Sequence, residues 1–422
     1  MDQTRENIVE AGIIIIGNEV LSGETLDTNS QYIGKKLNEL GILVRRKISI
    51  PDRHEDIIDA INQLSACCRV LIVSGGLGPT NDDITKKTLA TYYQSELVFD
   101  KEVFREIERL LKHRVSVISE VHRNQAYIPA CAKVLSNNLG TASGLLFEEN
   151  GHILIALPGV PYELRGLMDN KVYPFLKNLS DSIKLVNLNI KTIGLGESVI
   201  AQKIKDIEDS LPAYIKLAYL PSIGQVKLRL TAQNGKESLI LAEMEEIQNR
   251  IVSRIENYIY GFGDITFSEA LGELLRSRGS NLSIAESCTG GFVAHTITSV
   301  SGSSQYFNGG VIAYSNEIKV SELQVEESII KTFGAVSKEC AEAMAIGVRN
   351  KFNTNYAIAT TGIAGPDGGT EDKPVGTVWL AVASENSVIS KMIVFDRGRL
   401  QNIQFSTMTV LNMLRKLILQ LN

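Results

Sequence analysis

Short apolar segments alternate with amphipathic segments over the first 180 residues of the chain. This alternation is typical of βαβ units, in which parallel strands are buried beneath helices. The sequence therefore predicts an α/β domain with a doubly wound, mostly parallel sheet. We expect strands at 11–16, 42–50, 69–73 and 153–157, and helices at 28–40, 53–64 and 83–93, with Asp27 or Thr28 as the first N-cap.

The length of 422 residues requires more than one hydrophobic core, and the pattern of elements changes twice along the chain. We expect a first domain over 1–178, a small α+β module over 179–262 and a second α/β domain over 263–422. In the module the periodicity predicts strands at 184–192, 215–219 and 225–232, and helices at 197–211 and 237–258.

The last domain begins with the capping-box pattern Thr266-Phe267-Ser268-Glu269, which predicts a helix that ends near Arg278. Its strands are expected to end in turns rich in glycine, serine and threonine, so strand ends would form its working surface. We expect strands at 281–285, 356–360, 376–383 and 388–395, and helices at 292–299, 338–352 and 399–421.

Charge and cysteine content exclude several classes of protein. The formal net charge is -5 and no basic stripe is visible, which argues against sequence-independent binding to nucleic acid. The five cysteines lack a CxxC spacing, so a disulfide framework or a structural zinc site is not indicated, and we expect a cytoplasmic protein. The apolar run 13–16 is too short for a membrane span, and we expect no membrane partner.

Two loops of the first domain follow predicted strands directly. One extends from Gly17 to Asn29, and the other from Ser74 to Thr85. Ligands of doubly wound sheets bind at the carboxyl ends of strands, and glycines let the backbone approach a phosphate closely. Aspartates in the second loop could hold a cation or orient water. The alternative interpretation is that Asp82 or Asp83 only caps the following helix.

A turn in the last domain brings together several reactive groups. Glu286, Ser287, Cys288 and Thr289 lie between a predicted strand and a predicted helix, followed by two glycines. A strand-to-helix turn exposes side chains and backbone N–H groups to a ligand. Ser287 is therefore a candidate nucleophile. Cys288 is the rival, because a thiol at a helix N-terminus gains thiolate character, and its alternative role is that of a small buried residue.

A hydroxyl nucleophile also needs a base within hydrogen-bond reach. His295 is the only histidine of the last domain, and its spacing from Gly291 places it on the helix surface, which argues against a Ser-His-Asp triad. Lys319, one turn beyond Ser315, is better placed, because burial can lower the pKa of a lysine toward neutrality. The alternative interpretation is an ordinary solvated lysine.

These motifs, taken in order, resemble those of the CinA family of competence/damage-inducible proteins. The first domain is similar to the MoaB/Mog-like molybdopterin-binding fold, with the patterns GNE-LSG, GGLGPT-x-DD-x-T and PGVP-x-E. The middle module resembles the KH-type insert of the family, although it lacks a clear Gly-x-x-Gly clamp. The last domain resembles nicotinamide mononucleotide deamidase of the PncC type, with AESCTGG, GSS, FNGG, AYSN-x-x-K and TTGIAGP.

For the last domain the resemblance implies hydrolysis of nicotinamide mononucleotide to nicotinate mononucleotide and ammonia, a step of pyridine nucleotide salvage that needs no cofactor. It implies Ser287 as nucleophile, Lys319 as base and Tyr314 as an aid to proton transfer. Arg399 is preferred to Arg397 as the phosphate ligand. The remaining substrate-binding residues that it implies are Glu286, Thr289, Gly290, Gly302, Ser304 and Thr361.

For the first domain the resemblance implies a metal-dependent ADP-ribose pyrophosphatase that yields AMP and ribose 5-phosphate. The expected cofactor is a divalent metal ion held by Asp82 and Asp83. The expected substrate-binding residues are Glu19, Glu24, Asp27, Asn29, Gly75, Gly76, Gly78, Thr80, Asp82 and Asp83. Both substrates are small nucleotides, and the family favours a homodimer. The competing hypothesis is a non-catalytic scaffold that binds nucleotides or molybdopterin in competence or DNA damage.

Overall fold

A computed structural model describes residues 9–80, 82–112, 119–178, 186–232 and 237–421. The chain divides into two compact units near Val186. The first unit contains β1 Glu10–Ile16, α1 Asn18–Leu21, α2 Thr28–Glu39, β2 Leu43–Ile50, α3 His54–Ser65, β3 Val70–Ser74, α4 Thr85–Tyr92, β4 Leu97–Phe99, α5 Lys101–Leu111, α6 Glu120–Asn124, β5 Tyr127–Pro129, β6 Lys133–Leu135, β7 Gly144–Glu149, β8 His152–Leu157, α7 Pro161–Leu167, η1 Met168–Val172 and α8 Tyr173–Lys177.

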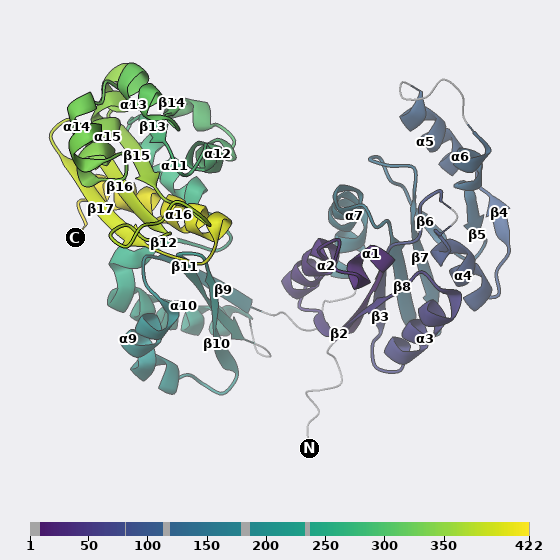
Figure 1. Cartoon of the computed structure of the whole chain (residues 1–422). Helices are drawn as coiled ribbons and strands as arrows, with labels where there is room; N and C mark the ends of the chain where they lie inside the picture. Colours follow the sequence, from purple (N-terminus) through teal and green to yellow (C-terminus); the bar gives the residue numbers. More distant parts are fainter. Residues whose placement is uncertain (1–8, 81, 113–118, 179–185, 233–236, 422) are drawn as a thin grey trace. The chain divides into compact units, whose positions relative to one another are not determined.

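The main sheet of the first unit has the order β2-β1-β3-β8-β7-β6 (Figure 1). The pairs of β1 with β2 and β3, and of β3 with β8, are parallel, while β7 and β6 are antiparallel additions. The four predicted strands and three predicted helices of this domain are present. The sequence pattern did not reveal β6, β7 or the excursion from β4 to β5, because these strands are short or join a hairpin at the sheet edge.

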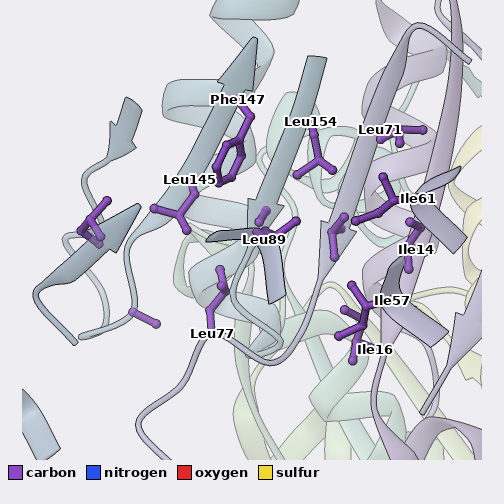
Figure 2. Packing of buried hydrophobic residues seen from close by; sticks show 14 of the residues in the cluster. Ile14, Ile16, Ile57, Ile61, Leu71, Leu77, Leu89, Leu145, Phe147 and Leu154 are labelled. Carbon is purple, nitrogen blue, oxygen red and sulfur yellow. The ribbon is translucent and has the colours of Figure 1, made fainter. Parts of the chain in front are cut away.

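Alternate residues of β1 point to opposite faces of this sheet, and both faces are covered by helices. Ile14 and Ile16 pack with Ile57 and Ile61 of α3 (Figure 2), while Ile13 and Ile15 belong to the cluster that includes Ile33 and Leu37 of α2 and Leu164 of α7. Burial on both faces explains why β1 and β3 are apolar without alternation. The first domain is therefore doubly wound, as predicted.

The second unit begins with the small α+β module. Its sheet has the order β10-β11-β9-β12, in which β12 is a short strand that the sequence pattern assigned to no element. The first two residues of the predicted strand 184–192 lie outside the described residues. The module contains β9 Val186–Ile193, α9 Glu197–Asp209, β10 Ile215–Ser222, β11 Gln225–Ala232, α10 Glu237–Ile255, η2 Glu256–Tyr258 and β12 Ile259–Phe262.

The C-terminal domain has a five-stranded sheet of order β14-β13-β15-β16-β17. Strands β14, β13 and β15 are parallel, whereas β16 and β17 are antiparallel. Its elements are α11 Phe267–Ser277, β13 Leu282–Glu286, α12 Phe292–Thr298, η3 Ser303–Gln305, β14 Phe307–Ile312, α13 Asn316–Leu323, α14 Glu327–Phe333, α15 Lys338–Phe352, β15 Tyr356–Gly362, β16 Thr377–Ala383, β17 Val388–Val394 and α16 Arg399–Leu419. The predicted capping box of Thr266 and Glu269 is present.

The module and the C-terminal domain share one hydrophobic core. Ile193 of β9 belongs to the cluster formed by α11, α12 and α16. Arg415 of α16 is buried, and its guanidinium donates to the carbonyl oxygens of Asn257 and Ile259. A buried cation held by backbone carbonyls fixes the contact in one geometry.

No helix among the described residues is long and apolar enough to cross a membrane.

Candidate active sites

Ser287 directly follows β13, where three parallel strands end. Its backbone N–H donates to Thr360 O of β15 at 2.9 Å, which fixes the start of the turn. The Nζ atom of Lys319 lies 3.1 Å from Ser287 Oγ. Lys319 comes from α13, whose N-cap is Ser315, at the carboxyl end of β14. Two neighbouring strand ends thus bring together the expected nucleophile and the expected base.

Lys319 is almost completely buried, with 1% of its surface exposed. It is therefore not a solvated surface lysine. Burial lowers the pKa of Lys319, although Cys340, Cys288 and Glu317 act in the opposite direction. A lowered pKa makes the neutral amine more accessible than in a solvated lysine, which is a property that a candidate general base needs.

The hydrogen-bond partners of Lys319 can accommodate both the ammonium and the neutral amine. Nζ donates to Ala313 O at 2.8 Å and to Tyr314 O at 3.3 Å, and Ser315 O lies at the longer distance of 3.5 Å. A neutral amine has two N–H donors and one lone pair. In the neutral state two carbonyls would satisfy its donors, and the lone pair would be free to accept from the Ser287 hydroxyl. The same carbonyls can stabilise the ammonium that forms after proton transfer.

The thiol of Cys288 lies in an environment that opposes ionisation. It is 6% exposed, and burial raises the pKa of Cys288 to about 12. Only the thiolate is a good nucleophile, so at neutral pH this thiol is unreactive. The expected gain of thiolate character at the helix N-terminus does not occur, because desolvation outweighs it. This environment favours Ser287 over Cys288 as the candidate nucleophile.

Glu286, which was expected to contact the substrate, instead contacts backbone N–H groups. It is completely buried, and its carboxylate accepts hydrogen bonds from the backbone N–H groups of Gly291, Val293 and Ala294 at 2.8–3.0 Å. These are donors at the start of α12 that would otherwise have no partner. Glu286 therefore shapes the turn that carries Ser287, and the sequence-based assignment to substrate binding is corrected.

The hydroxyl groups of Thr289 and Thr361, near the turn, also form hydrogen bonds within the protein. Thr289 Oγ1 lies 2.7 Å from Thr360 Oγ1, and Thr361 Oγ1 donates to Ala335 O at 2.7 Å. Gly290 has a positive φ of 61°, which a residue with a side chain adopts only rarely. Among the described residues, the N–H groups of Cys288 and Thr289 in this turn donate to no backbone carbonyl, so both are candidates to bind an oxyanion.

Tyr314 and Arg399 meet at the same edge of the sheet. Arg399 donates to the Tyr314 hydroxyl at 3.2 Å and to Gly365 O at 2.7 Å, and both residues are exposed. The backbone N–H of Arg397 instead donates to Asn402. These contacts favour Arg399 over Arg397 as the cation of the site. The tyrosine side chain thus faces the proposed phosphate ligand, and only its backbone carbonyl contacts Lys319.

Two predicted substrate ligands lie away from Ser287 in this copy of the chain. Gly302 is the N-cap of η3 and Ser304 lies within it, immediately before the amino end of β14. Leu282, the first residue of β13, pairs there with Phe307. Ser287 lies at the other end of β13, about 16 Å away at 3.3 Å per residue. His295 is exposed on α12, as expected.

The first domain has an acidic pocket of about 440 Å³ at the carboxyl ends of its parallel strands. Of the predicted residues, the pocket is lined by Glu19, Gly75, Gly76, Gly78, Asp82 and Asp83. The loop conformation requires glycine: Gly75 has a φ of 118°, and a Cβ atom there would lie 2.1 Å from Ile16 O. At its glycines the loop therefore brings backbone close to the pocket wall.

Asp83 stabilises its own loop. Its carboxylate accepts hydrogen bonds from the backbone N–H and hydroxyl of Thr80, at 2.8 and 2.5 Å. Helix α4 begins only at Thr85, and no side chain caps its N-terminus. The alternative that Asp82 or Asp83 merely caps this helix is therefore wrong. In the part of the chain that the structure describes, no three His, Cys, Asp or Glu side chains are grouped to hold a metal ion.

Three residues of the loop from Gly17 to Asn29 that were predicted to bind substrate do not line the pocket. Asp27 caps α2 by accepting from Ser30, which settles the choice between Asp27 and Thr28. The Asn29 amide donates to Ser74 Oγ and Gly159 O and so ties loops together. Glu24 is exposed and lies outside the pocket lining. These residues support or flank the pocket, and among the acidic residues of this loop only Glu19 lines it.

The pocket is also lined by two carboxylates, Asp52 and Glu163, to which the sequence analysis assigned no role. Asp52 follows β2, and burial raises its pKa, with smaller contributions from Glu19, Asp82 and Asp83. Glu163 is buried in α7, where burial raises its pKa and a hydrogen bond from Asn137 opposes the shift. The position of Asp52 at the end of a parallel strand was a usable signal. Glu163 occurs in the PGVP-x-E pattern but received no role.

Fold and sites together define the class: an α/β protein with a buried serine–lysine pair in one domain and an acidic strand-end pocket in another. Three family profiles match, described as "Probable molybdopterin binding domain" over residues 12–178, "Damage-inducible protein CinA KH domain" over 188–261 and "CinA C-terminal domain" over 264–418. These matches agree with the predicted MoaB-like, KH-like and C-terminal α/β organisation.

Full-length relatives give the family. A CinA-like protein of Cytophaga hutchinsonii is 43% identical over 97% of this chain and 98% of its own length. A CinA-like protein of Flavobacterium psychrophilum is 41% identical over 98% of this chain and 99% of its own. The chain belongs to the CinA family. A crystal structure of competence/damage inducible protein CihA from Agrobacterium tumefaciens is 40% identical, with a TM-score of 0.34, covering 35% of this chain and 94% of that chain.

Proposed function

We propose that the C-terminal domain hydrolyses the carboxamide of nicotinamide mononucleotide and yields nicotinate mononucleotide and ammonia. The observation that carries this proposal is the 3.1 Å contact between Ser287 Oγ and the buried Nζ of Lys319. An unreactive serine becomes a nucleophile when a neutral amine accepts its proton. Membership of the CinA family is consistent with an enzyme and does not specify the reaction.

The chemistry proceeds in two stages. The neutral Lys319 amine accepts the hydroxyl proton while Ser287 Oγ adds to the carboxamide carbon. The resulting ammonium gives that proton to the departing nitrogen, the C–N bond breaks and ammonia leaves. Water then attacks the ester and transfers a proton to the same amine, which releases nicotinate mononucleotide and restores Ser287. One base thus acts in both directions, as acyl transfer requires.

Two further groups fit this reaction. The N–H of Thr289 can bind the oxyanion that forms at the carboxamide oxygen, since such donors stabilise charge that develops in the transition state. The guanidinium of Arg399 can bind the substrate phosphate, because its planar group matches phosphate geometry. Tyr314, which accepts from Arg399, would orient that guanidinium.

The proposal is tested by measuring ammonia released from nicotinamide mononucleotide by the purified full-length chain, with nicotinate mononucleotide quantified in parallel. We expect the two products in equal amounts, and we expect nicotinamide mononucleotide to be consumed without an added cofactor. Binding of the nucleotide with no release of either product would favour the competing interpretation, in which the domain is a non-catalytic scaffold.

We also propose that the first domain is a metal-dependent ADP-ribose pyrophosphatase. The observation that favours it is the pocket lined by Glu19, Asp52, Asp82, Asp83 and Glu163 beside a glycine-rich loop. These oxygen donors fit Mg²⁺, which is usually bound by one or two carboxylates together with substrate phosphates and waters. A cation bound there would neutralise the diphosphate. The glycine loop would admit the phosphates, and the acidic wall would favour the cation.

Asp83→Asn is expected to reduce ADP-ribose cleavage by about 10²-fold or more, because it removes a charge at the cation site and weakens the turn at Thr80. The measurement is AMP formation with Mg²⁺ and with excess chelator, and the wild type should lose activity in chelator. Asp59→Asn, at an exposed position of α3, is the matched control. Full cleavage in chelator would refute the metal requirement.

A further inference from the structure

A second cavity, of about 500 Å³, lies where the KH-like module meets the C-terminal domain. Its walls come from the turn between β9 and α9, the hairpin turn between β10 and β11, the edge strand β17 and the helix α16. All of these elements belong to one compact unit. The cavity is separate from Ser287 and from the acidic pocket, and its volume is in the usual range for a small-molecule site.

Two glycine turns form the module's side of this cavity. Gly194 and Gly224 both have positive φ, 83° and 73°, and Gly194 N–H donates to Gly224 O. A Cβ atom at Gly194 would lie 2.8 Å from the Asn412 amide, and one at Gly224 would lie 3.3 Å from Met408 Cβ. Side chains at these positions would therefore close the space between the module and α16.

The lining is mainly apolar. It includes Ile193, Ile393, Phe405, Met408 and Met413. Phe405 is held in place by stacking on Phe395, with ring centroids 4.2 Å apart. Methionine side chains adapt to irregular shapes and make favourable contacts with aromatic rings. Such a surface suits the flat ring of a ligand.

A positive region lies beside the apolar surface. Lys391 and Lys416 line the cavity, and so does Gly196, the N-cap of the 13-residue helix α9, at which no side chain caps the helix. An uncapped helix N-terminus presents N–H donors to an anion. Glu197 is the single acidic residue of the lining and is exposed. The lysines and the helix end together favour a negatively charged ligand.

One polar atom in the wall lacks a partner. The Oδ1 atom of Asn412 is buried and accepts no hydrogen bond from the described residues. An unsatisfied buried acceptor costs free energy, which a donor from a bound molecule would recover. Because the terminal torsion of asparagine is soft, a small rotation would present this oxygen to the cavity. A ring that carries an amino group supplies such a donor.

We propose that this cavity binds a small anion that carries a flat ring with an amino group, a ligand of the size and chemistry of a mononucleotide. The ring packs on Phe405 and the methionines, the amino group donates to Asn412, and the phosphate lies near Lys391, Lys416 and the start of α9. This site is additional to the two proposed active sites. It does not depend on their activities.

The test uses full-length protein with ¹³C-methyl methionine and AMP as the probe. The chain has seven methionines, so each signal can be resolved and assigned with single Met→Leu variants. We expect the signals of Met408 and Met413 to shift on titration, while those of Met168 and Met244, buried in other parts of the chain, stay constant. This readout reports on the cavity even if AMP also binds at an active site.

Variants and probe fragments decide the chemistry. Thr409→Trp, which fills the cavity, should abolish the shifts. Lys391→Ala should weaken AMP binding about tenfold, as expected for loss of one charge-assisted contact. Lys205→Ala, at an exposed position of α9, should have no effect. Adenosine and inorganic phosphate, each lacking half of the recognised groups, should bind at least about tenfold more weakly than AMP.

Three results would overturn the proposal. The first is the absence of any shift of Met408 or Met413 at millimolar AMP. The second is an unchanged titration in Thr409→Trp protein whose thermal unfolding shows that it is folded. The third is equal weakening in Lys391→Ala and Lys205→Ala, which would indicate attraction by overall charge and no defined site.

Discussion

Ser287→Ala is expected to lower kcat for ammonia release from nicotinamide mononucleotide by about 10⁴-fold or more, the size of effect seen when a nucleophile is removed from a catalytic unit. Among the described residues, the Ser287 hydroxyl is the only side-chain group that forms a hydrogen bond with Lys319 Nζ, and the other partners of Nζ are backbone carbonyls. Without the hydroxyl no ester can form. The measurement is steady-state ammonia release, with substrate affinity determined separately.

Cys288→Ala is the matched control for this prediction. It changes the adjacent residue, which is equally enclosed, and the thiol that it removes is held protonated by burial. We expect kcat close to that of the wild type, with a modest loss of stability of about 1 kcal/mol from the small void. If Cys288→Ala abolished turnover and Ser287→Ala retained it, the nucleophile would be the thiol.

Lys319→Gln is expected to reduce kcat by about 10³-fold, within the range observed when a general base is removed. Glutamine keeps a donor for Ala313 O but cannot accept the serine proton at useful strength. Lys319→Arg should fail to restore activity, because a guanidinium remains protonated. Lys338→Gln, at an exposed position of α15, is the control, and its kcat should match that of the wild type.

The pH dependence should identify the same group. Only the neutral amine accepts a proton, so kcat/KM should rise with pH through the pKa of Lys319 and then become constant. Because burial lowers that pKa, the midpoint should fall below the usual lysine value of about 10.4. Lys319→Gln should lose this rise. A wild-type midpoint at the usual lysine value would contradict the role of burial.

The sequence allowed most of the framework to be predicted because local signals agreed with tertiary structure. Burial on both faces left β1 and β3 as apolar runs, and the capping box at Thr266 marked the start of α11. The rule that ligands gather at the carboxyl ends of parallel strands located both the Ser287 turn and the loop after β3. Short strands such as β4 and β6 were not predicted, because a strand of three residues shows too little periodicity.

The positions of several predicted site residues depend on long-range geometry. Nothing local distinguishes a substrate-binding glutamate from Glu286, whose carboxylate accepts from helix amides up to eight positions along the chain. Gly302 and Ser304 belong to a motif of the domain but lie at the amino end of β14, a placement that follows from strand pairing. Asp52 was overlooked because it stands alone after β2, without a recognisable motif.

The burial of Lys319 could not be established from sequence either. A lysine on an eight-residue helix is usually solvated, and its spacing from Ser315 does not reveal what covers it. Its enclosure arises where α13 packs against α15 and the lysine side chain reaches the turn after β13, which the sequence order alone does not show. The cavity between the KH-like module and α16 has the same origin, since its walls are more than 150 residues apart along the chain.

The role of Ser287 is tested most directly by trapping the ester. Wild-type protein mixed with nicotinamide mononucleotide and quenched in acid within the first turnovers should gain the mass of the substrate minus ammonia, and peptide mapping should place the adduct on Ser287. Ser287→Ala should show no adduct, while Cys288→Ala should show it at the same serine. An adduct on Cys288, or ammonia release from the Ser287→Ala protein at the wild-type rate, would contradict the proposed mechanism.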